Sequence, residues 1–525
     1  MVWSFFRGGP GGSWRFGLAS GCCMVGTSLS RRPARQAPRR RDGHFAVDGP
    51  EVESDAKMAS QMRESASATP PPAPGPKGQR LHNLRQRTEN FGAFADELRR
   101  DYGEVVSFEL PFMKCCVVFD AELVREVLVT QQQYFRPWFP GDLSDDWKYG
   151  SISLHQGEEH RRRAEFMTSV FAGDSEGGYA EIIAEQATIL RERLAAGQGV
   201  DLVKEFERFA WDAIVEIVLG RGVELPRQLG EDTLTLQKTY LLLDILPGPR
   251  LFKSLPLPVL RRGRKSVGLV DAAIYGAMRR ARDSGYSGRD VVAQYVRALD
   301  LEGAAGGLDS DQAIRDELII LLTGFIDAPT SALTFGVHYL ARNPDVRLKV
   351  EREADAVLNG GSVQPADFDR LPYTGAVLDE VLRIDPPTAV MLPKEATEDR
   401  VLGGYLIPRG TLVHVAMRAL HHGSEHWDRP SDFRPERWLE ESPPHCPAHA
   451  YIPFGLGPHF CQGMDIARRI FVFGMASLVN RLRLEPRSTD PPNRNDTAVG
   501  VVGPWTADVH ERRDSSRLQA GEQHA

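Results

Sequence analysis

The sequence predicts a mainly helical fold with a small strand-rich portion. Apolar residues recur with helical spacing from about Gly177 to Leu382, a pattern typical of amphipathic helices that pack on one another. Two shorter stretches, Val105–Val118 and Thr397–Val415, are apolar runs bounded by proline or glycine, which is typical of strands. Apolar residues make up 42% of the 525 residues, enough for one large core. We therefore expect one folded domain over residues 76–490.

The elements can be placed in order along this domain. Val105–Val118 predicts two strands that meet at Pro111, because proline interrupts an otherwise apolar run. A helix is expected next, over Asp120–Thr130. Ala376–Ile384 predicts another helix, and the short strands follow from Thr397.

The longest predicted element is a central helix over Asp311–Arg342, roughly 45 Å long at 1.5 Å per residue. Ser310 is a good N-cap, and Asn343 precedes a proline that ends the helix. The helix is apolar almost all round, as a buried helix is. Pro329 lies inside it and cannot donate to the carbonyl of Phe325, so we expect the helix to kink or open there.

Both ends of the chain are predicted to lie outside the domain. Residues 1–75 have the composition of a non-folding leader, and Pro70–Pro76 should form a stiff, extended linker. A transit peptide, a disordered arm, or sequence upstream of a later start such as Met58 all remain open. Residues 491–525 read as a polar tail that frays after Ser488. We expect a cytoplasmic protein, with an organelle-targeting leader as the less favoured alternative.

Composition restricts the partners. The net charge of -7 and the pI near 6.1 argue against nucleic acid. No apolar run reaches the length of about 18 residues that a membrane-spanning helix needs, so no transmembrane helix is expected. The six cysteines show no Cys-x-x-Cys spacing, which indicates free thiols in a reducing compartment. We expect a monomer.

One ten-residue segment carries the strongest chemical signal. Glycines let the backbone turn sharply and pack against a flat ligand, and a helix that begins just after a cysteine stabilises its thiolate. A buried free cysteine in a glycine-rich turn is the simpler alternative, but it does not require so many residue types at fixed offsets. The positions concerned are Phe454, Gly455, Gly457, His459, Cys461 and Gly463.

This segment is similar at every position to the haem-binding signature of the cytochrome P450 family, Phe-Gly-x-Gly-x-(Arg/His)-x-Cys-x-Gly. The resemblance implies the cytochrome P450 fold, in which a long central helix lies over haem b. It also implies that Cys461 is the thiolate ligand of the iron. Phe454, Gly455 and Gly463 would then line the haem, and His459 would reach a propionate.

Upstream motifs resemble the same family. Glu380-Val381-Leu382-Arg383 resembles its Glu-x-x-Arg helix, and Pro435-Glu436-Arg437-Trp438 resembles the segment that supplies a second arginine. Alone, Glu380 and Arg383 would be an ordinary surface pair one helical turn apart. The resemblance implies instead that Glu380, Arg383 and Arg437 form a buried network, which is tolerable only if all three charges are satisfied together.

Further cofactor contacts follow from the resemblance alone. The segment around His160 resembles the family's C-helix, and His160 matches a residue that binds a propionate. The usual arginine four residues later is Ala164 here, so Arg162 or Arg163 would have to substitute. Lys394 aligns with another propionate-binding position, and an ordinary surface lysine is an equal alternative.

The central helix departs from the family pattern. The family has (Ala/Gly)-Gly-x-(Asp/Glu)-Thr, which places Asp327 at the acid position and Ala328 at the threonine position. That threonine guides proton delivery, and alanine cannot. Thr330 lies two residues on, roughly 200° around an ideal helix, and replaces it only if a kink re-aims it. Asp327 and Thr330 are our catalytic candidates, although Asp327 could merely cap a broken helix.

The resemblance implies a monooxygenase that inserts one oxygen atom from O₂ into an organic substrate. We expect a small, largely apolar substrate held by the aromatic loop Phe135–Ser153. Electrons would come from NAD(P)H through a separate ferredoxin or flavoprotein. Because of Ala328, a peroxygenase, isomerase or dehydratase is the alternative, and a non-enzymatic haem sensor is a third possibility.

Overall fold

The computed structural model describes residues 70–138, 151–172, 178–195, 197–243, 251, 254–304, 306–439, 447–494 and 500–512. Its contacts divide the chain into Met1–Pro70 and Pro71–Ala525, and only the second unit is described below. The predictions for a leader before residue 70 and for the centre of the substrate loop, residues 139–150, lie outside the described residues. Localisation and oligomeric state remain predictions.

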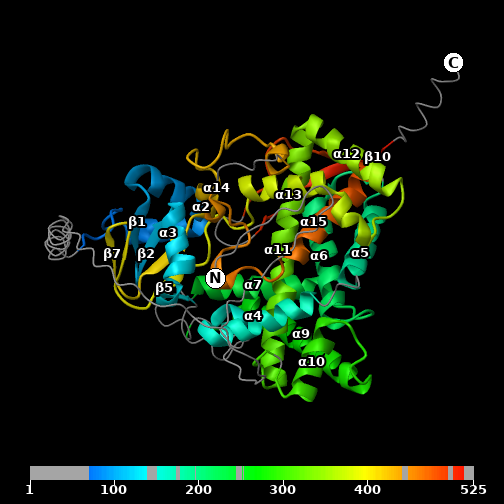
Figure 1. Cartoon of the computed structure of the whole chain (residues 1–525), viewed down its shortest axis with the longest axis horizontal. Coiled ribbons are helices and arrows are strands. Elements are labelled where there is room, and N and C mark those ends of the chain that lie inside the picture. The colour runs from blue at the N-terminus through cyan, green and yellow to red at the C-terminus, as the bar shows by residue number, and fades with distance from the viewer. Residues whose placement is uncertain are drawn as a thin grey trace, which may run out of the picture. The chain divides into compact units, whose positions relative to one another are not determined.

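The prediction of a mainly helical fold is confirmed. The longer helices gather on one side of the unit in Figure 1, and the larger sheet with α2 and α3 lies on the other. The helices are α2 (Arg80–Tyr102), α3 (Ala121–Arg125), α4 (Gly157–Ala172), α5 (Gly178–Leu194), α6 (Leu202–Leu219), α7 (Arg227–Leu243), α9 (Pro258–Asp283), α10 (Val291–Glu302), α11 (Asp311–Arg342), α12 (Pro344–Leu358), α13 (Pro372–Ile384), α14 (Met417–His421) and α15 (Met464–Arg481).

Short helical turns connect these elements. A π-helical turn, η1 (Glu126–Thr130), continues α3, so the predicted helix over Asp120–Thr130 is confirmed in extent but not in type throughout. The remaining turns are 3₁₀: η2 (Gln132–Tyr134), η3 (Ile152–Leu154), η5 (Pro365–Arg370), η6 (Pro435–Trp438), η7 (Ala448–Ala450) and η8 (Gly457–His459).

The strands form three small sheets, with orders β1-β2-β8-β5-β3, β4-β10-β9 and β6-β7. The only parallel pair among these described strands is β2 with β8. Their bounds are β1 (Val105–Leu110), β2 (Met113–Val118), β3 (Phe135–Pro137), β4 (Val200–Asp201), β5 (Lys394–Ala396), β6 (Arg400–Leu402), β7 (Tyr405–Ile407), β8 (Leu412–Val415), β9 (Leu482–Pro486) and β10 (Thr506–Glu511).

The larger sheet is buried on both faces. Phe108 and Cys115 belong to a cluster with Phe91 of α2, whereas Cys116 and Val413 belong to a second cluster with Val124 of α3. Residues one position apart point to opposite faces of a sheet. The strands are therefore continuous apolar runs rather than alternating ones, as their sequence suggested.

Helix α11 is the core of the helical part. The side chain of Ser310 accepts from the backbone N–H of Ala313, which confirms the predicted N-cap. Within the described residues, α11 is the one helix long and apolar enough to cross a membrane, and most of it is buried inside the protein. It is the central helix of a folded core.

The predicted opening of α11 at Pro329 is not observed. The helix continues from Asp311 to Arg342 with Pro329 inside it. Its flanks pack closely on α15, where a Cβ on Gly336 would lie 2.9 Å from Met475 and Phe471. Packing of this kind holds the helix together although Pro329 offers no N–H to the Phe325 carbonyl.

The expectation that the chain frays after Ser488 was wrong. Strand β10 lies inside the predicted tail, residues 491–525, and pairs with β9 and β4. Ala507 and Val509 are buried in the main core, with Trp505 just before the strand. The strand is short and its partners lie elsewhere in the chain, so local composition did not reveal it.

Candidate haem site

The cysteine loop is shaped by glycines at positions closed to other residues. Gly455 and Gly457 have φ of +81° and +77°, in the left-handed region that favours glycine. A Cβ on Gly457 would lie 2.1 Å from the carbonyl oxygen of Leu128, and one on Gly463 would lie 2.1 Å from the ring of Phe325. These glycines therefore let the loop pack closely on η1 and α11. The motif alone did not reveal these tertiary contacts.

Cys461 follows η8 and precedes α15. Its backbone N–H donates to the carbonyl of Phe454 (2.9 Å), which closes the loop on itself. The Cys461 side chain presents exposed surface, yet burial raises the pKa of its thiol, while the backbone N–H of Gly463 lowers it. A molecule in contact can thus reach the sulfur, although the surrounding protein partly desolvates it.

That combination fits a metal ligand. A thiolate that is poorly solvated needs a cation beside it, and iron would supply one. Within the described chain no group of three or more His, Cys, Asp or Glu residues could hold a metal ion. Cys461 is thus the described residue best suited to bind the iron of a haem.

Three basic side chains from distant segments meet beside this loop. The rings of His160 on α4 and His459 on η8 lie 4.2 Å apart between centroids. His459 Nε2 lies 3.0 Å from the carbonyl of His155. Burial and the charge of Lys394 lower the pKa of His160 to about 4 and that of His459 to about 3. Burial also lowers the pKa of Lys394 to about 8.

No carboxylate among the described residues pairs with His160, His459 or Lys394. Lys394 carries the positive charge of this cluster at neutral pH, and a charge is costly to bury unless an anion joins it. The propionates of a haem are such anions, so the cluster fits the group. The three predicted propionate contacts, His160, His459 and Lys394, are brought together.

The predicted contribution of Arg162 is not seen. Arg162 is exposed, and its guanidinium carbon lies 3.8 Å from the place of a Cβ on Gly307. It lies roughly 200° around α4 from His160. Arg163 is buried but is paired with Glu159 at 2.6 Å. Neither arginine joins the basic cluster.

The distal candidates lie on α11. The contact of Phe325 with Gly463 places this part of α11 against the start of α15. Thr330 is 1% exposed, and its Oγ1 has no hydrogen-bond partner among the described residues. Asp327 is partly buried and packs on Gly500, whose Cβ would lie 3.0 Å from it. Asp327 and Thr330 are therefore close in sequence but differ in burial and surroundings.

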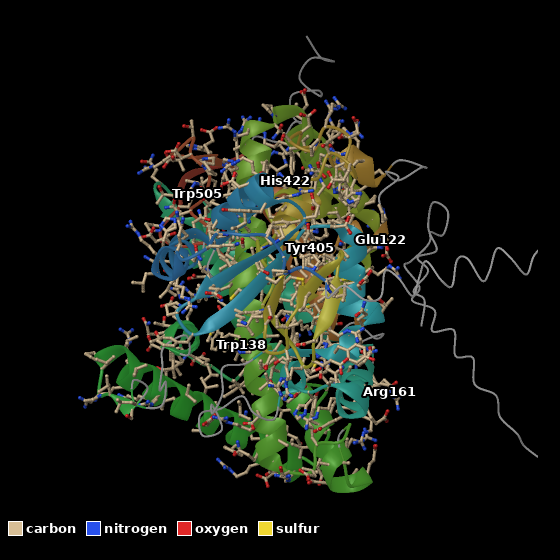
Figure 2. The ribbon with its side chains drawn as sticks, turned by 90° about the vertical axis from the view of Figure 1, so that its left-hand side faces the viewer. Glu122, Trp138, Arg161, Tyr405, His422 and Trp505 are labelled. Atoms are coloured by element: carbon tan, nitrogen blue, oxygen red, sulfur yellow. The ribbon has the colours of Figure 1, made fainter. Side chains whose placement is uncertain are left out.

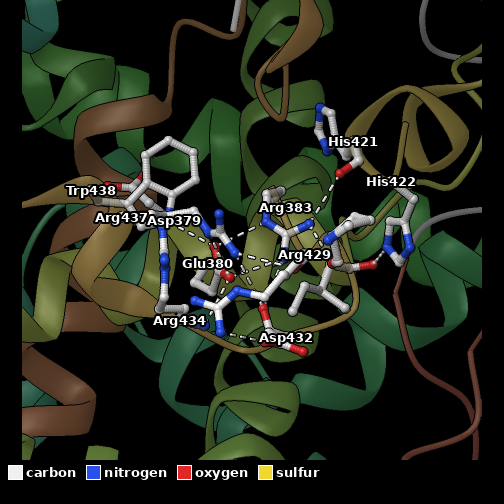
Figure 3. Close-up of polar contacts among 12 residues, drawn as sticks. Asp379, Glu380, Arg383, His421, His422, Arg429, Asp432, Arg434, Arg437 and Trp438 are labelled. Atoms are coloured by element: carbon white, nitrogen blue, oxygen red, sulfur yellow. Dashed lines mark hydrogen bonds and ion pairs between the residues drawn. The ribbon is translucent and has the colours of Figure 1, made fainter. Parts of the chain in front are cut away.

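The predicted Glu-Arg-Arg network is confirmed (Figure 3). Arg383 donates to both oxygens of Glu380 at 2.9 and 3.0 Å, and Arg437 Nε donates to Glu380 at 3.0 Å. All three side chains are at most 1% exposed. Trp438 Nε1 and the backbone N–H of Arg434 complete the set of donors to Glu380.

Some residues of the site were missed by the motifs. His155 contributes only its backbone carbonyl to His459, and a backbone contact leaves no signature in residue type. Glu317 on α11 is fully buried and accepts from the backbone N–H of Ile152 at 2.8 Å, which fixes η3 just before His155. The sequence offered one signal for a buried role of Glu317, namely a charged residue within an otherwise apolar helix.

A reachable thiol beside a central helix, next to a basic cluster suited to carboxylates, defines a haem-thiolate protein. Comparison with known sequences gives the family. A sequence model of the family Cytochrome P450 matches residues 70–508. The chain therefore belongs to the cytochrome P450 family, for which a haem iron is implied.

Relatives share most of their length with this chain. It is 29% identical over 467 residues to steroid 17-alpha-hydroxylase/17,20 lyase of Felis catus, covering 81% of this chain and 89% of the relative. It is 26% identical over 389 residues to cyclooctat-9-en-7-ol 5-monooxygenase of Streptomyces melanosporofaciens (73% and 83%). It is 25% identical over 421 residues to abscisic acid 8'-hydroxylase 1 of Arabidopsis thaliana (78% and 85%). These relatives are monooxygenases and hydroxylases, and this chain is a member of that P450 monooxygenase family.

Proposed function

We propose that this protein inserts one oxygen atom from O₂ into a small, largely apolar organic substrate. The observation that carries the proposal is the meeting of Cys461 with the basic cluster of His160, His459 and Lys394. These residues come from three separate segments, namely α4, β5 and the cysteine loop, and one flat cofactor with a ligandable metal and two carboxylates accounts for all of them. Bound haem would supply the oxygen-activating redox chemistry.

The chain's own residues have distinct tasks in this proposal. Cys461 binds the iron, and the glycines around it let the loop pack on the cofactor. The basic cluster orients the cofactor through its carboxylates. Asp327 and Thr330 move protons on the α11 side, where the buried Thr330 hydroxyl has no hydrogen-bond partner among the described residues.

Electrons would come from NAD(P)H through a separate ferredoxin or flavoprotein. The substrate itself stays open, because the relatives are named for unlike molecules: cyclooctat-9-en-7-ol, a steroid and abscisic acid.

A second activity has one specific observation in its favour. Ala328 stands where the family has a threonine, and a proton path without that hydroxyl favours a substrate that brings its own protons, such as hydrogen peroxide. A peroxygenase is therefore the alternative.

The ligand assignment is tested by the carbon-monoxide difference spectrum of the reduced, haem-loaded protein. We expect the Soret band of a haem-thiolate complex in the natural chain and its loss in Cys461→Ser. Arg162→Gln, a change of an exposed residue on α4, serves as the control and should keep the band. The same band in Cys461→Ser would overturn the assignment.

The two activities are separated by their co-substrates. Product formed with O₂, NAD(P)H and a ferredoxin system supports the monooxygenase. Product formed with hydrogen peroxide alone, and none with the ferredoxin system, supports the peroxygenase. A panel of apolar ring compounds serves as the substrate library in both arms.

A further inference from the structure

A second basic site lies on the face of the larger sheet that α2 covers, away from Lys394. Arg87 of α2 keeps part of its side chain at the surface, but the protein around it lowers the pKa of its guanidinium by partial burial. Its Nε is buried and has no hydrogen-bond partner, and no carboxylate of the described chain pairs with it. A partly desolvated guanidinium with no carboxylate beside it leaves its N–H donors available to an anion.

His414 of β8 is the second member of this site. It is 1% exposed, and its Nδ1 lies 3.3 Å from the carbonyl of Met391. Because a carbonyl only accepts, Nδ1 carries the proton and Nε2 is left as an acceptor. That Nε2 is buried and has no partner in the described chain.

The two groups share one aromatic wall. The guanidinium carbon of Arg87 lies 5.2 Å from the centre of the Phe91 ring, and the His414 ring lies 4.9 Å from the same ring. The charge of Arg87 reaches His414, because it contributes with burial to lowering the pKa of His414 to about 3. Asn83, one turn before Arg87 on α2, adds a third unpartnered buried atom, its Oδ1.

Two other titratable side chains near this site, Cys115 and Glu395, are neutral or already paired. Cys115 on β2, beside Arg87, stays a neutral thiol because burial raises its pKa to about 12. Glu395 of β5 lies opposite Leu412 of β8. Leu412 and His414 are two residues apart on β8, so Glu395 lies on the same face of the sheet as His414. Its carboxylate, however, binds Arg136 at 2.8 Å. Neither residue offsets Arg87.

The surroundings of the pair are apolar. Leu84, Trp138 and Met113 pack on the cluster that contains Phe91 and Leu412. Figure 2 looks onto this side of the molecule and shows Trp138 at the lower end of the blue strands. The backbone N–H of Trp138 donates to Pro393, two residues after the Met391 that holds His414. A ligand here would therefore place its polar end on Arg87 and His414 and its body on aromatic and aliphatic side chains.

We propose that Arg87 and His414 bind the carboxyl group of an organic acid with an apolar body. Arg87 supplies N–H donors to the carboxyl oxygens. The neutral imidazole of His414 accepts a hydrogen bond from the protonated carboxyl oxygen, or takes that proton itself. Either way, binding a carboxylate from neutral solution takes up one proton. The site is independent of Cys461 and needs no assumption about the reaction.

The test is calorimetric titration of the haem-loaded chain with octanoate at pH 7, with 1-octanol and inorganic phosphate as separate ligands. We expect octanoate to bind with uptake of about one proton, measured by comparing buffers of different ionisation enthalpy. A charge-assisted hydrogen bond is worth enough that 1-octanol should bind roughly tenfold more weakly or worse. Phosphate, which has no apolar body, should bind more weakly than octanoate.

Matched variants decide where octanoate binds. Arg87→Gln should weaken octanoate binding roughly tenfold or more and leave 1-octanol unaffected. Arg85→Gln, on an exposed face of the same helix and paired with Glu89, should change neither. His414→Gln should abolish the proton uptake. If that buried variant fails to fold, the number of protons taken up by the natural chain and by Arg87→Gln is compared instead, to show whether proton uptake accompanies binding at this site.

Several outcomes would overturn the proposal. Equal octanoate affinity in the natural chain and in Arg87→Gln would mean that the ligand binds elsewhere. Equal binding of octanoate and 1-octanol would mean that only apolar contact matters. No binding of any probe would mean that ordered water alone joins Arg87 and His414. Phosphate as tight as octanoate would make this a site for inorganic anions.

Discussion

Lys394 is the charged side chain of the haem site, and its burial in the fold disfavours the protonated form. Burial lowers its pKa from 10.5 to about 8. Between these two values the unfolded chain binds more protons than the folded chain, so the folded state of the haem-free protein gains stability as pH rises from about 8 to about 10.5. Below pH 8 Lys394 is charged in both states, and its burial costs stability in full.

Lys394→Met removes this cost while keeping the length of the side chain. We expect the haem-free protein at pH 7 to gain up to about 3 kcal/mol in free energy of unfolding. The haem-loaded protein should instead lose haem faster, because a propionate has lost its partner. Urea unfolding of the haem-free form and haem transfer to an acceptor protein measure the two effects. A variant that is less stable without haem would contradict the assignment.

Thr330 presents the opposite case, a neutral group with an unmet hydrogen bond. Thr330→Val replaces the buried hydroxyl by a methyl group and should stabilise the protein by about 1 kcal/mol. If the hydroxyl takes part in proton delivery, the fraction of consumed O₂ that appears in product should fall roughly tenfold or more.

Thr334 offers the matched control for this change, one turn further along α11. Its hydroxyl donates to the carbonyl of Thr330 at 2.7 Å. Thr334→Val should therefore lower stability slightly and leave the coupling of O₂ to product unchanged. Oxygen uptake and product yield are measured together, and unchanged coupling in Thr330→Val would exclude the role for its hydroxyl.

Helix α13 is joined to η6 and α14 by a network of ion pairs and hydrogen bonds in which the guanidinium of Arg383 donates to several acceptors. Besides Glu380, Arg383 donates to the carbonyls of His421, Pro430 and Asp432. The arginine therefore satisfies backbone acceptors that α13 and the following loop would otherwise bury. The network holds these elements together through hydrogen bonds rather than through net charge.

Arg383→Gln should destabilise the haem-loaded protein by about 3–5 kcal/mol, because it leaves buried acceptors unmet and Glu380 with one arginine fewer. Arg161→Gln is the control: Arg161 also binds two carboxylates on α4, but it is 53% exposed and should cost under about 1 kcal/mol. Urea unfolding monitored by tryptophan fluorescence compares them. Equal losses in both variants would show that burial adds nothing to this network.

At the scale of the whole molecule, the C-terminal part of the chain closes the helical core. Strand β10 pairs with β9 and β4, and Arg512 just after it binds Asp355 of α12 at 2.8 Å. The last residues described therefore tie α12, α15 and the start of α6 together. Trp505, Ala507 and Val509 are each at most 7% exposed there.

Truncation measures this closure. A chain ended after Gly503 loses three buried side chains and should lose at least about 5 kcal/mol of stability, or fail to fold. A chain ended after Arg512 keeps every described contact and should stay within about 0.5 kcal/mol of the full chain. Thermal unfolding of the two haem-loaded proteins makes the comparison. Tolerance of the shorter chain would show that β10 is not part of the core.

The sequence by itself determined the helical class, the bounds of α11, the two strands around Pro111 and the cysteine loop. These features depend on local rules: apolar spacing, caps, proline positions and glycines where φ is positive. It also determined the partners of Glu380, because a family motif fixes both ends of that network.

Only the tertiary structure decided the rest. It placed Arg162 at the surface, away from the basic cluster. It also kept α11 helical through Pro329 and paired residues of the predicted tail in a sheet. It also brought Lys394 to two histidines and left Arg87 beside His414. Each outcome depends on contacts between residues far apart in the chain, and burial there sets both the charge of a group and the cost of leaving it unpaired.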